Sequence, residues 1–410
     1  MRIAIVANDT RGGVQPYLAL GLGLRAAGHD VRVVAPSDFT SMFSEAGLPM
    51  APLSGSVEAT LRGSAGEGNR GAIASMRFVA RELPRRMQAW TRETLEGCEG
   101  ADIITGGVGG MVVGLAVAER LGTPFIETHL QPVGAPTAAY PGVLLPGTPS
   151  WLGGWGRRMS HHVSEAALWM PFRRAMTSSR EQVLGLTGPT PGFAGRPALY
   201  GFSRYVLPAL PQRDRPRHVT GYWTRATEAS WRPPAGLDAF LARGGPVVSI
   251  GFGSMAADDP VAVTEMVLGA VREAGVRAVL LAGWGGLQTL ADENVYCADM
   301  LPHDWLFPRV DAAVHHGGAG TTGAALQSGT PAIVVPFTMD QPFWGARVAA
   351  LGVGPSPIPR RRLSQARLAE ALARTLSDFG MRERASNLGA RIRAENGVAE
   401  AVGQLERLSG

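Results

Sequence analysis

The sequence predicts an α/β protein of two domains, each built around a parallel β-sheet. Its 410 residues are enough for two or three domains, and 45% hydrophobic with 18% charged residues is the composition of a globular chain with a sizeable core. Short apolar stretches alternate with helical patterns, which is the order of a parallel sheet with right-handed crossovers. The alternation stops near residue 200 and restarts near residue 246, which indicates two halves of similar size.

The first half begins with an apolar strand, a polar glycine-bearing loop and a helix that stops at Gly28. A second unit of strand, turn, helix and strand follows, and its turn reads GGVGG. The predicted strands are residues 2–7, 30–35, 101–105 and 124–128, and the predicted helices are residues 15–27, 111–121 and 160–187. Because parallel sheets bind ligands at the carboxyl ends of their strands, the loop at residues 9–16 and His129 are site candidates.

Two segments of this half depart from the repeat. Residues 54–90 hold a Gly/Ser-rich loop and then a basic helix over 76–90, and they would form either a flexible cover over a cleft or a solvated surface insertion. Residues 131–155 are rich in proline and aromatic residues. Loops of this length without structure of their own are usually functional or mobile.

The second half repeats the pattern after a connection-like segment at residues 199–231. Its predicted strands are residues 246–250, 277–281, 294–298, 312–315 and 332–335, and its predicted helices are residues 262–274 and 321–327. The predicted division is a domain at 1–205, a linker at 206–220, a domain at 221–385, and a C-terminal helix at 386–410 that packs back on the first domain.

Composition excludes several classes of function. The net charge of +5 comes mostly from arginine, without the basic and aromatic clusters of a nucleic-acid reader. Cys98 and Cys297 lie far apart and define neither a metal spacing nor a disulfide framework. The first residues read as a strand rather than a signal peptide, and no apolar run reaches the roughly 18 residues of a membrane span. We therefore expect a cytoplasmic protein with no integral membrane segment, for which peripheral contact is still open.

A glycine-rich turn within VDAAVHHGGAGTTGAALQSGTPAIVVP is the clearest chemical signal. Glycines 317, 318 and 320 allow backbone to approach a ligand closely, because they lack a Cβ. Thr321 and Thr322 stand where the next helix exposes unpaired N–H groups and the positive end of its dipole, and His316 adds a side-chain donor. This arrangement predicts a phosphate site.

A second glycine turn, GFGSM, follows the strand at residues 246–250. Gly251, Gly253 and Ala256 fit the dinucleotide fingerprint, but no carboxylate ends the next strand, so dinucleotide binding is disfavoured. Ser254 would donate to a phosphate oxygen or cap the following helix. Two such turns on neighbouring strands suit a diphosphate held without metal, since the chain has no P-loop lysine motif and no D-x-D pair.

Asp340 and Gln341 follow the last predicted strand of this half. Side by side they offer the acceptors and donors that sugar hydroxyls need, or else they cap the next helix.

Together these motifs resemble a known family. HHGGAGTT and PFTMDQPFWGARVAALGVG, preceded by AGWGG and PHDWLFP, resemble the donor half of inverting nucleotide-sugar glycosyltransferases of GT-B fold. The closest branch holds bacterial antibiotic and sterol glucosyltransferases, and TRGGVQPYLALGLGLRAAGHDV and QPVGAPTAAYP resemble the same branch. The resemblance covers nearly the whole chain and implies two Rossmann-like domains that face each other across a cleft.

The resemblance also implies roles for individual residues. A diphosphate would be held by Ser254, His316, Gly318, Ala319, Gly320 and Thr321. The nucleobase and ribose pocket would be lined by Trp284, Met300, Leu301 and His303, and the sugar would be bound by Asp340 and Gln341.

One departure concerns the general base. The branch usually reads RGD in an acceptor-side loop, and its aspartate is taken to deprotonate the acceptor; this chain has Arg11, Gly12 and Gly13 there, followed by Gln15 after one residue. The candidates for the base are Asp9 and then His129, with Asp340 kept mainly as a sugar ligand. Asp9 could instead only accept hydrogen bonds from loop N–H groups. An acceptor with an acidic hydroxyl, such as a phenol, would need less help from a base.

The expected activity is transfer of a hexose from a UDP- or dTDP-sugar to a hydroxyl of an apolar natural product, sterol or phenol, with inversion and with no metal or cofactor. Two alternatives stay open: a non-catalytic partner protein that binds nucleotide sugar, and a sugar-nucleotide epimerase.

Overall fold

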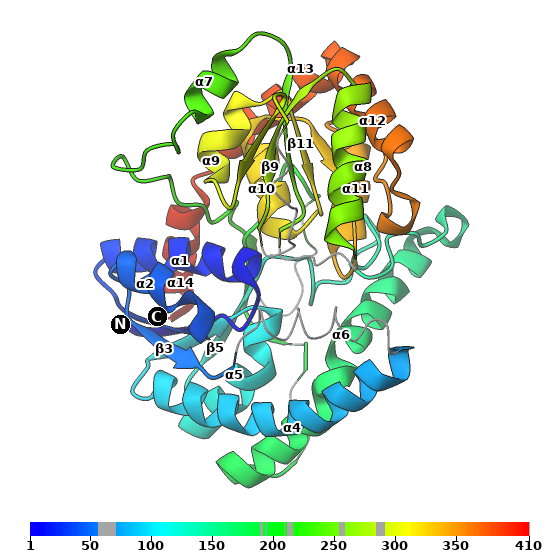
Figure 1. Ribbon diagram of the computed structural model, residues 1–410. Helices are drawn as coiled ribbons and strands as arrows, with labels where there is room; N and C mark the ends of the chain where they lie inside the picture. The colour runs from blue at the N-terminus through cyan, green and yellow to red at the C-terminus, as the bar shows by residue number, and fades with distance from the viewer. Residues whose placement is uncertain are drawn as a thin grey trace. The chain divides into compact units, whose positions relative to one another are not determined.

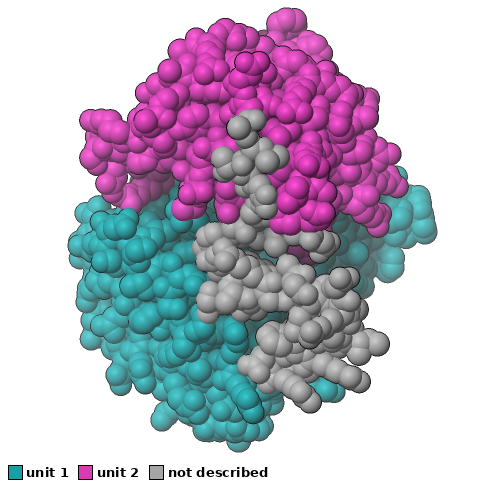
Figure 2. Space-filling model, in the orientation of Figure 1, with its two compact units in different colours: residues 1–224, 395–410 teal, residues 225–394 magenta. Residues whose placement is uncertain are grey.

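The computed structural model describes residues 1–55, 71–188, 192–193, 195–208, 210, 216–253, 259–283 and 292–409, with the backbone alone at residues 71–82 (Figure 1). Within these ranges the chain forms two compact units (Figure 2). Unit 1 comprises residues 1–224 and 395–410, and unit 2 comprises residues 225–394.

In its described residues, unit 1 has a seven-stranded sheet in the order β3-β2-β1-β4-β5-β6-β7, and every neighbouring pair is parallel. The strands are β1 (Arg2–Val6), β2 (Asp30–Pro36), β3 (Met50–Leu53), β4 (Ile103–Gly106), β5 (Phe125–His129), β6 (Ala198–Tyr200) and β7 (Arg217–Val219). Ile3 of β1 pairs with Val31 on one side and with Ile103 on the other. The strand order therefore reverses direction between β1 and β4, and α/β sheets bind ligands at such a switch point.

The helices of unit 1 pack on this sheet. Because helices cover both faces of a parallel sheet, its strands are made of apolar residues. The helices are α1 (Arg11–Ala26), α2 (Thr40–Glu45), α4 (Gly71–Cys98), α5 (Val108–Leu121), α6 (Gly153–Leu184) and α14 (Gly397–Ser409), with short 3₁₀ turns η1 (Ser37–Phe39) and η3 (Ser150–Leu152). Helix α5 packs against β1, β4 and β5 and is buried along most of its length, whereas α14 packs against α1.

Three expectations for unit 1 are wrong. Helix α1 begins at Arg11 rather than at residue 15, so most of the expected acceptor-side loop is helix: its buried Gly13 and Val14 pack well enough to override the poor helix propensity of glycine. Helix α6 begins at Gly153 rather than at residue 160. Residues 217–219, placed in a linker, form β7, because the edge of β6 offers hydrogen bonds that no local pattern reveals.

In its described residues, unit 2 has a five-stranded parallel sheet in the order β10-β9-β8-β11-β12. The strands are β8 (Val247–Gly251), β9 (Arg277–Leu281), β10 (Val295–Ala298), β11 (Ala312–His315) and β12 (Ala332–Val334). The helices are α7 (Leu237–Ala242), α8 (Pro260–Glu273), α9 (His303–Leu306), α10 (Ala319–Ser328), α11 (Gln341–Ala350), α12 (Gln365–Ser377) and α13 (Phe379–Arg393), with 3₁₀ turns η4 (Phe307–Arg309) and η5 (Arg360–Arg362). The switch point of this sheet lies between β8 and β11.

The boundary between unit 2 and the C-terminal segment that returns to unit 1 lies after Ala394, later than the predicted boundary before residue 386. Helix α13 belongs to unit 2 and packs on α10, and the chain returns to unit 1 at Glu395. None of the described helices has the length and apolarity needed to cross a bilayer.

Candidate functional site

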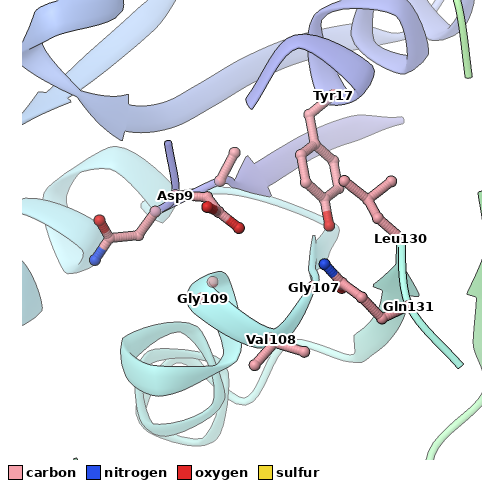
Figure 3. A pocket seen from close by; sticks show the side chains of 10 residues that line it. Asp9, Tyr17, Gly107, Val108, Gly109, Leu130 and Gln131 are labelled. Carbon is pink, nitrogen blue, oxygen red and sulfur yellow. The ribbon is translucent and has the colours of Figure 1, made fainter. Parts of the chain in front are cut away.

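The switch point of unit 1 holds a small recess. It is lined by the loop after β1, by Tyr17 of α1, by the turn after β4 and by the residues after β5, as Figure 3 shows. The lining residues are Ala7, Asn8, Asp9, Tyr17, Gly107, Val108, Gly109, Gly110, Leu130 and Gln131. Its free volume holds about one water molecule, so it can take a reacting group but not a whole acceptor.

Asp9 occupies the space beside Gly13. A Cβ atom built on Gly13 would lie 2.3 Å from Asp9 Cγ and 2.4 Å from Asp9 Oδ2, far inside van der Waals contact. The Asp9 carboxylate therefore stands where a side chain on residue 13 would leave the backbone. Asp9 presents its carboxylate from the loop after β1, next to the position of Gly13 on α1.

Asp9 lies just before the start of helix α1. Its Oδ1 accepts a hydrogen bond from the backbone N–H of Thr10 (2.6 Å), and it stands one residue before the N-cap of α1, near the positive end of the helix dipole. The hydroxyl of Tyr17 donates to the carbonyl of Thr128 (2.5 Å). Burial, with the nearby Asp9 charge as a smaller cause, raises the pKa of Tyr17, so the phenol stays protonated as a donor.

His129 lies in a different setting from Asp9. Its side chain is fully buried on β5, and its Nε2 is 2.9 Å from Oε2 of Glu127, whose Oε1 accepts from Nε of Arg196 (2.9 Å). Because residues two apart on a strand share a face, the contact between Glu127 and His129 follows from the sequence FIETH. Its ring also packs on Tyr200, at 5.5 Å between centroids. Buried in this way, His129 gains no support as the base.

We expect the change His129→Ala to lower the stability of unit 1 and to leave the rate of turnover nearly unchanged. It removes a buried ring and one partner of a buried carboxylate, which costs about 3–5 kcal/mol of unfolding free energy. Urea denaturation should show this loss, while turnover per folded molecule stays within about threefold, well below the hundredfold of a lost base. The exposed His162 on α6 provides the control, since His162→Ala should leave both quantities unchanged. A hundredfold fall in kcat without a loss of stability would restore His129 as the base.

The switch point of unit 2 brings together the two predicted glycine turns. Strands β8 and β11 are hydrogen-bonded neighbours, with Gly251 opposite His315, so the turns that follow them share one edge. The ring of His316 lies between these turns. A Cβ on Gly253 would lie 3.0 Å from His316 Cε1, and a Cβ on Gly318 would lie 2.6 Å from His316 Nε2. Both glycines therefore make room for the imidazole.

Among the described residues, no side chain caps the first turn of helix α10. Its N-cap is Gly318, which has no side chain to accept from the N–H groups of Ala319, Gly320 and Thr321 in the first turn. Nδ1 of His316 is buried and makes no hydrogen bond to any described part of the chain. A helix N-terminus with an uncapped first turn and a side-chain donor beside it is suited to an anion.

The imidazole of His316 is neutral at physiological pH. Burial, and secondarily the charge of His303, lower the pKa of His316 to about 4. The adjacent His315 is buried, its pKa is lowered by the same cause, and its Nδ1 accepts from the N–H of Gly317 (3.0 Å), which shapes the turn. His316 would thus act as a neutral hydrogen-bond donor.

Asp340 and Gln341 lie at the start of α11, beyond β12. Oε1 of the buried Gln341 accepts from the N–H groups of Phe337 (2.8 Å) and Thr338 (3.1 Å), so this amide holds the loop in shape. Oδ2 of Asp340 accepts from Nε1 of Trp344 (3.0 Å), which orients the carboxylate. Asp340 is therefore the better placed of the two for a sugar hydroxyl.

The predicted nucleobase side is only partly described, since Ser254 and Trp284 lie outside the described residues. Met300 is exposed after β10, whereas Leu301 is buried. The ring of His303 stacks on that of Phe307, with 4.5 Å between the ring centroids and 8° between the ring planes. Its electrostatic interaction with His316 is the smaller cause of the lowered pKa of His316. The chain after β10 thus crosses toward the β8/β11 edge, although β10 is two strands away from β8.

Tyr17 and Gln131 line the unit 1 recess but were not predicted as site residues. Gln131 follows β5 by two residues, so the rule that selected His129 could have selected it as well. Tyr17 reads as one more apolar position of α1, and nothing in the sequence shows that its hydroxyl turns toward β5.

The sequence of this chain is similar to that of known proteins. A family model described as "Erythromycin biosynthesis protein CIII-like, C-terminal domain" matches residues 266–408. Sterol 3-beta-glucosyltransferase of Neosartorya fischeri is 34% identical over 99% of the chain, which covers 29% of that relative. The corresponding enzyme of Pichia angusta is 33% identical over 98% of the chain, which covers 33% of it. The chain therefore spans about a third of the length of these curated relatives.

Solved structures show the same fold along the whole chain. The glycotransferase of kitacinnamycin aligns with a TM-score of 0.72 at 21% identity, over 100% of this chain and 99% of that one. VinC in complex with DTDP aligns with a TM-score of 0.67 at 20% identity over the same shares. Along nearly its whole length this chain is similar in sequence to the sterol glucosyltransferases and similar in fold to the solved glycosyltransferases. The two parallel sheets are those of its GT-B fold, as the resemblance predicted.

The two switch points carry different side chains. Unit 1 places a carboxylate, Asp9, at the β1/β4 edge, and unit 2 places the N-terminus of α10 with His316 at the β8/β11 edge. One edge is suited to accept a proton and the other to hold an anion.

Proposed function

We propose that this protein transfers a hexose from a nucleoside diphosphate sugar to a hydroxyl of an apolar small molecule, with inversion at the anomeric carbon and without a metal. The observation that carries the proposal is the first turn of α10, where uncapped N–H groups and the His316 ring meet between two glycine turns. These are donors for a diphosphate, and a diphosphate is the leaving group of sugar transfer.

The proposed reaction is a single displacement. The acceptor oxygen forms a bond to the anomeric carbon as the bond from that carbon to the diphosphate oxygen breaks. The acceptor proton passes to Asp9, and the diphosphate leaves with its negative charge stabilised by the α10 N–H groups and His316. One displacement at one carbon inverts its configuration. Asp340, oriented by Trp344, would bind a sugar hydroxyl.

The relatives support the substrate classes. Those named sterol 3-beta-glucosyltransferase suggest an apolar acceptor, and VinC was solved with a thymidine diphosphate. UDP- and dTDP-sugars are therefore both proposed donors, and sterols, natural products and phenols are the proposed acceptors.

We expect UDP or dTDP to stabilise unit 2 against heat. A ligand at a hundred times its Kd adds about 2.7 kcal/mol, which raises the Tm of a unit this size by about 5–10 °C. A panel of UDP- and dTDP-sugars screened by thermal shift, with ADP as control, should identify the donor. Acceptors can then be screened by mass spectrometry.

The anomeric configuration of the product tests the reaction itself, because a retained anomer would contradict a single displacement. Binding without turnover on any acceptor would favour a non-catalytic partner protein, and release of an epimerised sugar nucleotide without acceptor would favour an epimerase.

A further inference from the structure

An apolar face runs along the first half of α6 and the turn before it. Trp151 is in η3, and Trp155, Met159 and Val163 follow at intervals of four residues, which places them on one side of a helix. The side chains of Trp151 and Trp155 are 82% and 67% exposed, and Met170 continues the line two turns later. We call these five residues the α6 face; its first turns lie near the right-hand edge of Figure 1.

An apolar groove adjoins this face. The loop at residues 144–149 forms one wall, and Leu152, Trp155, Met159 and Val163 form the other. Leu145 of the loop is also exposed. Large exposed apolar side chains gathered in this way are uncommon on a soluble surface and mark a contact with another body.

The charges beside the α6 face are positive. Arg158 and His162 are exposed between its apolar positions, and Arg173 and Arg174 are exposed at its far end. Residues 141–174 contain four arginines and a single acidic residue, Glu165. That carboxylate is turned inward, where it accepts from the N–H of Gly134 (2.9 Å). The α6 face is therefore apolar and cationic at once.

This combination decides among the possible occupants. From Trp151 to Met170 the face is about 28 Å long at 1.5 Å per residue, more than one small acceptor would fill. A second copy packed through a two-fold axis would set the α6 face, with its arginines, against the same cationic face. A bilayer with anionic headgroups satisfies both features, since tryptophan rings favour the headgroup level and arginines bind phosphate.

We propose that the α6 face docks this protein reversibly on anionic lipid bilayers, with α6 lying in the plane of the interface. The proposal is independent of the donor chemistry, because the residues that it uses belong to η3, to α6 and to the loop at residues 144–149 of unit 1.

The test is co-sedimentation of the whole protein with vesicles of phosphatidylcholine, with and without phosphatidylglycerol. We expect the apparent affinity for vesicles to rise at least about tenfold with phosphatidylglycerol and to fall with salt, because anionic lipids attract the basic residues and salt screens that attraction. The double variant Trp151→Ser, Trp155→Ser should lose binding to both vesicles. Arg158→Glu with Arg173→Glu should remove only the preference for phosphatidylglycerol.

The control is Phe379→Ser, which removes an aromatic ring of similar exposure (77%) from unit 2 and should leave vesicle binding unchanged. Unchanged circular dichroism would show that the tryptophan variant folds; if it does not fold, the arginine variant carries the test. Absence of vesicle binding, or binding that both variants retain, would overturn the proposal. A concentration-dependent dimer that the tryptophan variant abolishes, without vesicle binding, would assign the face to a second copy instead.

Discussion

The variant Asp9→Asn is expected to lose at least about a hundredfold in kcat, because an amide cannot take the acceptor proton and general-base catalysis contributes about 10²–10⁴. The fold should survive, since asparagine keeps the size of Asp9 and its oxygen can still accept from the N–H of Thr10. Binding of UDP or dTDP should be unchanged, because Asp9 belongs to unit 1. Steady-state kinetics with calorimetric titration of the nucleotide would measure both quantities.

A double variant makes this test specific. Asp9→Gly with Gly13→Asp moves the carboxylate from the loop to the helix, into the same space, and should recover activity to within about tenfold of the parent protein. Gly13→Asp alone should be poorly active, because its Cβ would collide with the Asp9 carboxylate. Asp30→Asn, at the opposite end of the sheet, is the control for loss of a charge. If Asp9→Asn keeps full kcat with an acceptor alcohol, Asp9 is not the base.

The variant His316→Ala is expected to lower kcat/KM by about 10²–10³, the usual effect of removing one donor to a developing anion. It also leaves the space between Gly253 and Gly318 unfilled, so the two turns lose the ring that spaces them. Nucleotide affinity, measured by calorimetry, should fall together with the rate.

The variant His316→Gln separates the donor from the charge. Since the lowered pKa of about 4 leaves His316 neutral at pH 7, a neutral amide donor should keep activity within about tenfold of the parent. The control is His218→Ala on β7 of unit 1, which should behave as the parent. Equal losses for the alanine and glutamine variants would show that the imidazole contributes more than one neutral hydrogen bond, and an unchanged His316→Ala would remove it from the donor site.

Local patterns were enough to predict much of the architecture. The strand at Ala312–His315 was predicted at its observed bounds, and the pairing of β8 with β11 placed the two glycine turns together as expected. Periodicity predicts elements because burial on a parallel sheet demands apolar strands and one-sided helices. The start of α1 was missed because its first turn is held by packing, which overrides the propensities of Gly12 and Gly13.

The sequence by itself determined the fold class, the position of the glycine turn for which we propose phosphate binding, and the glycine at residue 13, because each depends on residue types at short spacing. Only the tertiary structure shows which carboxylate lies beside Gly13. From the sequence, Asp9 and His129 were both expected just beyond strands that end at the same edge; the structure places His129 as the last residue of β5. In space, His129 is buried against Glu127, whereas Asp9 lines the recess beside Gly13. Burial and distance are properties of the packed chain, so the sequence alone could not distinguish the buried imidazole of His129 from the carboxylate of Asp9 at the recess.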